Sequence, residues 1–200
     1  MILVAAIVVS IAVALLRGGR FTNLVSFPLR WGLLAVAAFA IQALFIYQTP
    51  TRKTIGVWGW QEIFFMTSHL LLLATVWLNR HLPGVKVIGL GLLLNLTVMA
   101  ANGGWMPVAP DAVVKVGHTG LVPSLETGTR VYSSKNIILP AEQTKLRFLS
   151  DIFILARLFP IPTIFSIGDV FVAAGIFLLI QGAMLGYGGG TGAEKISRRE

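Results

Sequence analysis

The chain has 200 residues, of which 56% are hydrophobic and only 12% are charged, and 16 Lys and Arg against 8 Asp and Glu give it a net charge of +8. So few charges cannot keep the apolar surface of one small domain in water, which predicts that lipid covers much of the chain. The absence of cysteine excludes disulfides, thiolate catalysis and Cys-ligated zinc or iron–sulfur clusters, and no basic run interleaved with aromatic residues indicates nucleic-acid binding.

Five apolar stretches predict an all-α transmembrane fold with about five membrane-spanning helices. The expected spans cover residues 1–17, 28–47, 62–78, 85–101 and 167–187. The first stretch predicts an uncleaved anchor, because the positive charges of Arg17 and Arg20 follow the apolar run instead of preceding it. Ser26 and Pro28 predict the start of the second span, as an N-cap and a first-turn proline.

The 65 residues 102–166 are too many for a bare connector, which predicts a folded segment outside the bilayer. The sequence favours a short helix over residues 110–117 that ends at a glycine, and a small hairpin from residues 130–132 and 136–139. Apolar residues recur at helical spacing over residues 145–159. This spacing predicts an amphipathic helix lying in the membrane interface.

Lys and Arg are distributed unevenly over the predicted loops. The loops after the first and third spans, counted with the adjoining ends of the spans, and the tail over residues 188–200 together hold eight of them, whereas residues 48–61 hold two. The positive-inside rule therefore places the N-terminus outside and the flexible, glycine-rich charged tail in the cytoplasm. Residues 1–187 are expected to form a single membrane domain, with residues 102–166 on its extracytoplasmic face.

His69, midway along the third span, is the candidate cofactor-binding residue. Ionisable side chains at membrane depth mark functional sites, and one ring nitrogen could ligate the metal of a haem or of a chlorophyll-type pigment. One alternative is a neutral imidazole that joins helices by hydrogen bonding to Asn95, Gln42 or a helix carbonyl. Proton or substrate handling is a further alternative.

Asp169 and Asp151 are the acidic candidates for a ligand site or a polar network. Ser166 lies three residues before Asp169, the spacing of a capping box at the start of the fifth span. The alternative for Asp169 is a buried carboxylate paired with Arg147, Arg157 or an external ligand. Asp151, four residues after Arg147, is expected to form a local ion pair with it.

Asn102, Gly103 and Gly104 predict the end of the fourth span, and their backbone amides could also bind an anion. A glycine stop followed by an interfacial Trp105 explains the same residues without a ligand. The chain lacks the Gly-x-Ser-x-Gly, His-Glu-x-x-His and phosphate-loop patterns. The sequence therefore assigns no catalytic residue and no metal ligand.

Six short motifs follow one another along the chain. They are LRGGR at residues 16–20, NRHLPG at 79–84, NGGWMP at 102–107, YSSK at 132–135, TKLRFLSD at 144–151 and FSIGD at 165–169. Together they resemble a family of bacterial multi-pass membrane proteins known only as a domain of unknown function. Ser150 and Asn136 stand where that pattern has glycine and, often, histidine. The resemblance covers nearly the whole chain, implies a bacterial inner membrane and brings no activity with it.

The small size, the lack of a catalytic set and the lack of a transporter-type repeat favour a non-enzymatic accessory or scaffold subunit of a larger membrane complex, photosynthetic or respiratory. Its expected partners are membrane lipids and other integral membrane subunits. The spans carry few small-residue packing motifs, so their flat helix faces could contact these partners. The alternative is a small membrane enzyme or carrier acting on a lipid or amphiphile at the extracytoplasmic face. Its site would lie among residues 102–106, Arg147, Asp151 and Asp169. A pigment- or haem-binding subunit using His69 is the second alternative.

Overall fold

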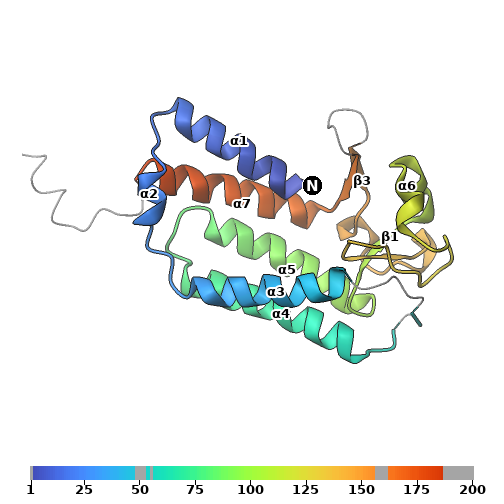
Figure 1. Cartoon of the computed structure of the whole chain (residues 1–200). Helices are drawn as coiled ribbons and strands as arrows, with labels where there is room; N and C mark the ends of the chain where they lie inside the picture. The colour runs from blue at the N-terminus through green and yellow to red at the C-terminus, as the bar shows by residue number, and fades with distance from the viewer. Residues whose placement is uncertain (1, 48–52, 55, 156–161, 187–200) are drawn as a thin grey trace, which may run out of the picture.

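The structure, a computed structural model, describes residues 2–47, 53–54, 56–155 and 162–186 of the chain. Five long helices form a bundle, and short strands gather beyond one end of it (Figure 1). The long helices are α1 (Ile2–Leu16), α3 (Gly32–Ile46), α4 (Trp60–Leu78), α5 (Val85–Ala101) and α7 (Ile167–Met184). The fold is therefore mostly helical, and these helices occupy the five apolar stretches. The predicted tail over residues 188–200 lies outside the described residues.

Two of the described helices, α4 with 19 residues and α7 with 18, are long and apolar enough to cross a membrane. The apolar helices α1, α3 and α5 are shorter, with 15, 15 and 17 residues. A 15-residue helix is only about 22 Å long, less than the ~30 Å of a hydrocarbon core. By length and composition, α4 and α7 are therefore candidate membrane spans, and five crossings stay a prediction.

Helix α5 packs closely on α7 because glycines bring the two backbones together. A Cβ atom on Gly91 would lie 2.5 Å from the carbonyl oxygen of Gly168. A Cβ atom on Gly84 would lie 2.2 Å from the carbonyl oxygen of Gly175. These glycines recur at a spacing of seven residues on each element, and small residues of this kind permit tight helix packing. The expectation of few small-residue packing motifs is therefore wrong.

Helix α1 packs along α7, and α3 packs along α4. The side-chain amide of Gln181 on α7 donates to the backbone oxygen of Ser10 at 2.7 Å, and its oxygen accepts from Arg17 at 2.9 Å. Asn79, directly after α4, donates to the backbone oxygen of Arg30 and accepts from its backbone nitrogen, both at 2.8 Å. Polar contacts therefore supplement apolar packing between helices that are distant in the sequence.

The chain between α1 and α3 departs from the prediction. A short helix, α2 (Thr22–Val25), precedes Ser26, whose hydroxyl bonds back to this turn. Helix α3 begins only at Gly32, after Trp31 has turned the chain with a φ of 56°. The predicted helix start at Ser26 and Pro28 is therefore wrong, because the residues before Ser26 complete a helical turn of their own.

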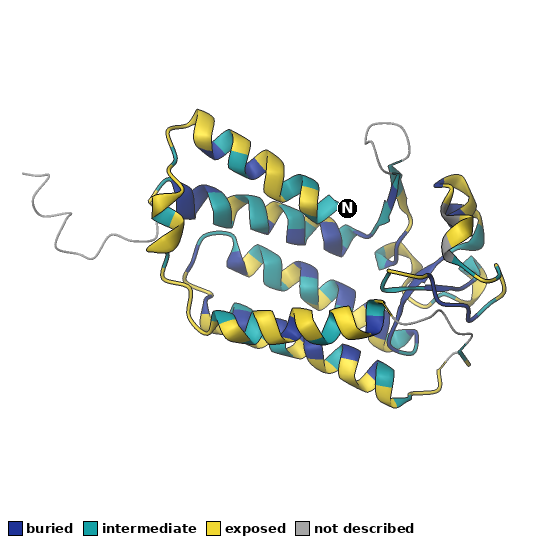
Figure 2. Cartoon of the chain, in the orientation of Figure 1, coloured by how far each residue is buried: buried dark blue, intermediate teal, exposed yellow. Residues whose placement is uncertain are grey.

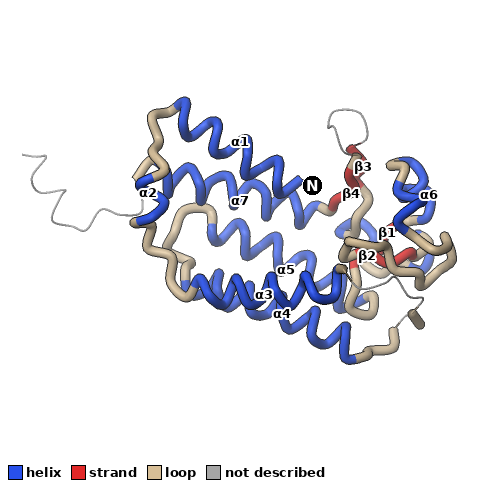
Figure 3. Tube along the Cα trace, in the orientation of Figure 1, coloured by secondary structure: helices blue, strands red, loops and turns tan. Residues whose placement is uncertain are grey.

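The segment between α5 and α7, residues 102–166, is folded from short elements (Figure 3). They are β1 (Met106–Val108), α6 (Pro110–Lys115), the 3-10 helix η1 (His118–Leu121), β2 (Asn136–Ile138), the 3-10 helices η2 (Ala141–Gln143) and η3 (Arg147–Leu149), β3 (Phe153–Leu155) and β4 (Thr163–Phe165). Strand β1 pairs in parallel with β2, and β3 pairs antiparallel with β4. The predicted short helix is confirmed as α6, and Gly117 follows it with a φ of 72°.

The predicted hairpin around Ser133 is confirmed in part. Arg130 forms an antiparallel bridge with Ile137, and the backbone nitrogen of Val131 donates to the backbone oxygen of Asn136 at 3.0 Å. Ser133 turns the chain with a φ of 57°. The first arm is a single bridge and not a strand, and β2 pairs with β1 through its other edge.

The prediction of an interfacial amphipathic helix over residues 145–159 is wrong for residues 145–155, which do not form one. Residues 156–159 lie outside the described part of the chain. The single turn η3 is followed by extended chain, in which the backbone nitrogen of Asp151 donates to the backbone oxygen of Pro107 at 3.3 Å. Pairing with the distant strands β1 and β4 replaces the helical hydrogen bonds that the local apolar spacing suggested.

Candidate functional site

Helix α7 begins with the predicted capping box. The hydroxyl of Ser166 accepts from the backbone nitrogen of Asp169 at 3.1 Å, and the Asp169 carboxylate accepts from the backbone nitrogen of Ser166 at 3.2 Å. Asn95 of α5 joins this cap. Its side-chain nitrogen donates to Asp169 Oδ1 at 2.8 Å, and its oxygen accepts from the Ser166 hydroxyl at 2.8 Å. The start of α7 is therefore bonded directly to α5.

Lys135, in the loop before β2, connects this cap to the folded segment. Its ammonium lies 2.8 Å from both oxygens of the Asp169 carboxylate and 3.6 Å from Asp151 Oδ1. Asp151 Oδ2 also accepts from the side-chain nitrogen of Asn136 at 2.7 Å. One cation thus bridges two carboxylates that stand on different elements. We call these residues, with Asn95 and Ser166, the Lys135 network.

Burial and neighbouring charges set the protonation of the two network residues Asp151 and Lys135 in the folded segment. Burial raises the pKa of the Asp151 carboxyl to about 6, although the Lys135 ammonium opposes the rise. Asp151 Oδ1 has no hydrogen-bond donor among the described residues, so its charged form is poorly solvated. Burial alone would lower the pKa of Lys135, but the charges of Asp151 and Asp169 outweigh it and raise that pKa. Lys135 is therefore charged at neutral pH.

A second buried cluster, which we call the Glu62 cluster, holds Trp105 against the start of α4. Glu62 Oε1 accepts from the indole nitrogen of Trp105 at 2.8 Å. The guanidinium of Arg130 lies 3.6 Å from the centre of the Trp105 ring, a cation–π contact, and donates to the backbone oxygen of Phe45 at 3.0 Å. Burial lowers the pKa of Arg130 to about 10, so the guanidinium is still charged at neutral pH. The cluster joins α3 and α4 to the folded segment.

Asn102, Gly103 and Gly104 end α5 as predicted, with φ values of 80° and 92° at the two glycines. The side chain of Asn102 accepts from the backbone nitrogen of Lys145 at 2.9 Å and donates to its backbone oxygen at 2.9 Å. The Gly104 amide donates back to a carbonyl of α5 at 2.8 Å. The asparagine therefore anchors the chain at residue 145, and anion binding by these amides stays a prediction.

Two further expectations are wrong. Trp105 is only 1% exposed and stacks on Phe65 with ring centres 4.7 Å apart, so it is a core residue and not an interfacial one. Asp151 pairs with Lys135, and within the described part of the chain it forms no ion pair with Arg147. The turn of η3 and the extended chain after it carry the two side chains apart.

His69 belongs to α4, and its side chain contacts α3. Its Nδ1 atom is 3.0 Å from the backbone oxygen of Phe65 and 3.5 Å from the side-chain nitrogen of Gln42. The expected neighbours, Gln42 and a helix carbonyl, are therefore both confirmed, whereas Asn95 bonds Asp169 instead. Haem or pigment ligation by His69 stays a prediction.

The structure thus brings together Asp151 and Asp169 of the predicted site residues, and leaves Asn102 and Arg147 outside their network. The predicted partner Arg157 lies outside the described residues. Among the residues that the structure describes, no group of three or more His, Asp or Glu side chains could hold a metal ion. The arrangement can fasten the folded segment to the bundle and can gain a proton in weak acid.

Sequence reasoning did not assign Glu62, Lys135 and Arg130 to a site, and it named Asn95 only as a residue that joins helices by hydrogen bonding. Glu62 and Asn95 are isolated polar residues at the edge of or inside apolar stretches, and this isolation was a usable signal. Lys135 is the last residue of the YSSK motif at residues 132–135, whereas Arg130 lies among ordinary polar loop residues. The local sequence does not reveal the partners of either residue, because the fold brings these partners in.

The profile of one protein family matches residues 26–181, most of the chain. That family is described as a family of unknown function, DUF5317. The chain belongs to this family. Five of the six motifs named above lie inside the matched residues, and the motif at residues 16–20 precedes them.

This DUF5317 member is similar to an uncharacterized protein of Thermotoga maritima. The two are 27% identical over 150 residues, an alignment that covers 72% of this chain and 76% of the relative. No solved structure matches the chain. The comparisons therefore establish the family and leave the activity to be argued from the geometry.

Proposed function

We propose that this DUF5317 protein is a non-enzymatic integral membrane protein, an accessory or scaffold subunit of a larger bacterial membrane complex. The observation that carries the proposal is that the charged groups at the end of the bundle bond one another. Asp169 and Asp151 share Lys135, and Glu62 holds the indole of Trp105. An enzyme or carrier acting on an amphiphile would instead direct such groups into a space that its substrate reaches.

The outer faces of the helices support a membrane location. Figure 2 shows exposed residues along the outer sides of α1 and α3. Large apolar side chains account for much of this exposure, namely Val4, Val8, Leu33, Val36, Phe39 and Leu44. Leu33, for example, is 81% exposed. Apolar surface in water costs about 25 cal/mol per Å², and contiguous patches of it mark contacts with lipid or protein.

The charges favour one orientation in the membrane. The bundle end opposite the folded segment carries five cations among the described residues: Arg17, Arg20, Arg30, Arg80 and Lys86. The other end holds the described Asp and Glu residues and six of the described Lys and Arg residues, but five of these six belong to the 65-residue segment 102–166, whose charge has little influence on orientation. The positive-inside rule supports a cytoplasmic location for the cationic end, with the N-terminus and the folded segment outside.

Extraction and purification test this proposal. We expect the protein to stay with membranes through an alkaline carbonate wash, to require detergent for extraction, and to elute in mild detergent with other integral membrane subunits. If it stays soluble without detergent, the membrane location is refuted. A detergent-solubilised, monodisperse monomer without co-purifying subunits would refute the scaffold role alone.

A charged residue on an outward face sharpens this test. Val36 on α3 is 63% exposed, and Val114 on α6 in the folded segment is 50% exposed. Val36→Arg is expected to reduce membrane retention or release the partner subunits, because it places a charge on a lipid- or subunit-facing surface. Val114→Arg is the matched control and is expected to leave both unchanged. Equal effects of the two variants would contradict the proposal.

A further inference from the structure

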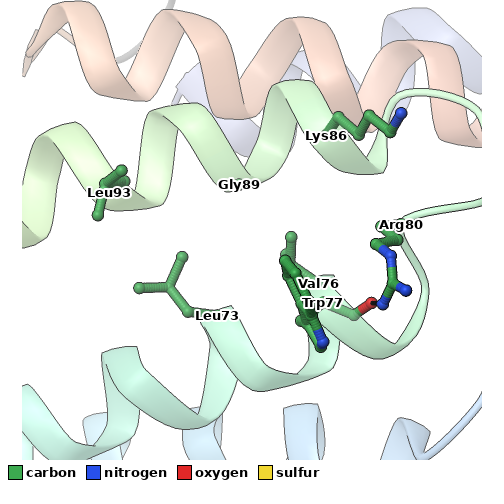
Figure 4. A pocket seen from close by; sticks show the side chains of 7 residues that line it. All are labelled: Leu73, Val76, Trp77, Arg80, Lys86, Gly89 and Leu93. Carbon is green, nitrogen blue, oxygen red and sulfur yellow. Dashed lines mark hydrogen bonds between the residues drawn. The ribbon is translucent and has the colours of Figure 1, made fainter.

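A groove lies between α4 and α5, and its charged mouth is at the cationic end of the bundle (Figure 4). Its volume is about 390 Å³, within the range of small-molecule sites. The apolar part is lined by Leu73, Val76, Gly89 and Leu93. Neither the buried clusters nor the proposed scaffold role uses this groove.

The shape of the groove suits a hydrocarbon chain. Figure 4 shows Leu73 of α4 and Leu93 of α5 at one end and Arg80 and Lys86 at the other. The wall runs from Leu73 on α4 to Arg80, which follows the end of the helix, and the helical part from Leu73 to Leu78 is about 8 Å long. Gly89 of α5 lies against Val76 of α4, since a Cβ on Gly89 would be only 2.7 Å from Val76 Cγ1, so the two helices are in contact here and the groove lies outside this contact. A flexible apolar chain can lie along the groove over these two residues.

The mouth of the groove is cationic. The guanidinium of Arg80 lies 4.4 Å from the centre of the Trp77 ring and donates to the backbone oxygen of Trp77 at 3.0 Å. These contacts hold Arg80 at the mouth and leave further N–H donors free. Within the described residues, no carboxylate pairs with Arg80 or Lys86. Two unneutralised cations beside an apolar groove complement one anionic group attached to a hydrocarbon chain.

We propose that this groove binds one anionic phospholipid of the cytoplasmic leaflet. Its phosphate lies between Arg80 and Lys86, and one acyl chain runs past Gly89 toward Leu93. Trp77 lies at headgroup level, where tryptophan is enriched in membrane proteins, and basic pockets between helices on the cytoplasmic side suit anionic headgroups. The inference rests on the membrane location proposed above and adds a specific ligand class to it.

Native mass spectrometry of the detergent-solubilised protein tests the proposal, with phosphatidylglycerol and phosphatidylcholine of identical acyl chains as probes. We expect one phosphatidylglycerol to be retained in preference to phosphatidylcholine. Arg80→Gln/Lys86→Gln should weaken this retention by roughly tenfold or more, given the contribution of each cation near an anionic lipid. Arg20→Gln/Arg30→Gln, which removes two exposed cations from the same end of the bundle, is the matched control and should retain the lipid. Leu93→Trp should displace both lipids, because it fills the groove without changing the charge.

Three outcomes would overturn the inference: equal retention of the two lipids, full retention by Arg80→Gln/Lys86→Gln, or an equal loss in Arg20→Gln/Arg30→Gln. The last would indicate a general attraction to cations at this end of the bundle. A protein that requires detergent but shows any of these results keeps its proposed membrane location and loses only the lipid site. A protein that is soluble without detergent loses both.

Discussion

Replacing Lys135 tests whether one ammonium group fastens the folded segment to the bundle. Lys135→Met keeps an unbranched side chain of similar length and removes the charge that lies 2.8 Å from both Asp169 oxygens and 3.6 Å from Asp151. Two buried carboxylates then face each other without a cation. Removing one partner of a buried ion pair is strongly destabilising because the remaining charge stays desolvated.

The expected loss is about 3 kcal/mol, the lower end of the range for buried pairs, because the Lys135 side chain is 23% exposed. For a chain of this size, that loss corresponds to a fall of roughly 6–12 °C in the thermal unfolding temperature. The assay is thermal unfolding of the purified protein in detergent at pH 7.5. Lys135→Met/Asp169→Asn should recover part of the loss, because it removes one of the two unpaired charges.

Lys115→Met is the matched control. Lys115 lies 3.1 Å from Asp111 in an ion pair whose side chains are 63% and 67% exposed. A surface pair of this kind contributes less than about 0.5 kcal/mol, so the unfolding temperature should hardly change. If Lys135→Met lowers the unfolding temperature no more than Lys115→Met does, the Lys135 network does not hold the segment in place.

Three further variants test other parts of the structure. The pKa of Asp151 is about 6 in the folded protein, above the value of about 4 in the unfolded chain. Between these two pH values, the folded protein holds a proton that the unfolded chain releases. The free energy of unfolding should therefore fall as the pH rises from 4 to 6 and then level off. Asp151→Asn should abolish that fall in unfolding temperatures measured between pH 4 and pH 8, and a retained fall would assign it to another group. Gly91→Ala should lower the unfolding temperature by roughly 2–10 °C, because its methyl group would lie 2.5 Å from a carbonyl oxygen of α7. The control Gly120→Ala, whose methyl group would have no atom within 4 Å, should leave it unchanged. Equal unfolding temperatures of the two variants would show that α5 and α7 can move apart freely. Glu62→Leu leaves the buried indole N–H of Trp105 without an acceptor and should lower the free energy of unfolding by about 1–3 kcal/mol. Glu62→Gln keeps an acceptor oxygen and should lower it less. A lower unfolding temperature for Glu62→Gln than for Glu62→Leu would contradict this account.

The parts of the fold that could be predicted from sequence are those set by near neighbours. Apolar runs in the sequence located the long helices, because the composition of a stretch mainly decides whether it is kept away from water. The capping box of Ser166 and Asp169 was predictable because its two residues are three positions apart. The glycines after α5 were predictable because they end a helix by their own backbone conformation.

The parts that could not be predicted depend on residues far apart in the chain. Lys135 reaches Asp169 across 34 positions, and Glu62 reaches Trp105 across 43. The apolar spacing over residues 145–159 is compatible with a helix, but the extended chain at Asp151 gains hydrogen bonds from β1 that a local pattern does not reveal. Half of the candidate site was therefore visible as isolated polar residues, and the cations that complete it were not.

In the proposed membrane orientation, the position of Asp169 in the third residue of α7 would also impose an order on biogenesis. The ribosome delivers Lys135 and the rest of the folded segment before α7, so the partner of the carboxylate would already be synthesised when α7, the last described helix, enters the translocation machinery. If the exported segment fails to fold, α7 would insert with a desolvated acid at its leading turn and would be poorly retained in the bilayer. Stable insertion of α7 would in this way depend on the prior folding of the segment before it. A chain whose segment did not fold would be exposed to membrane proteases.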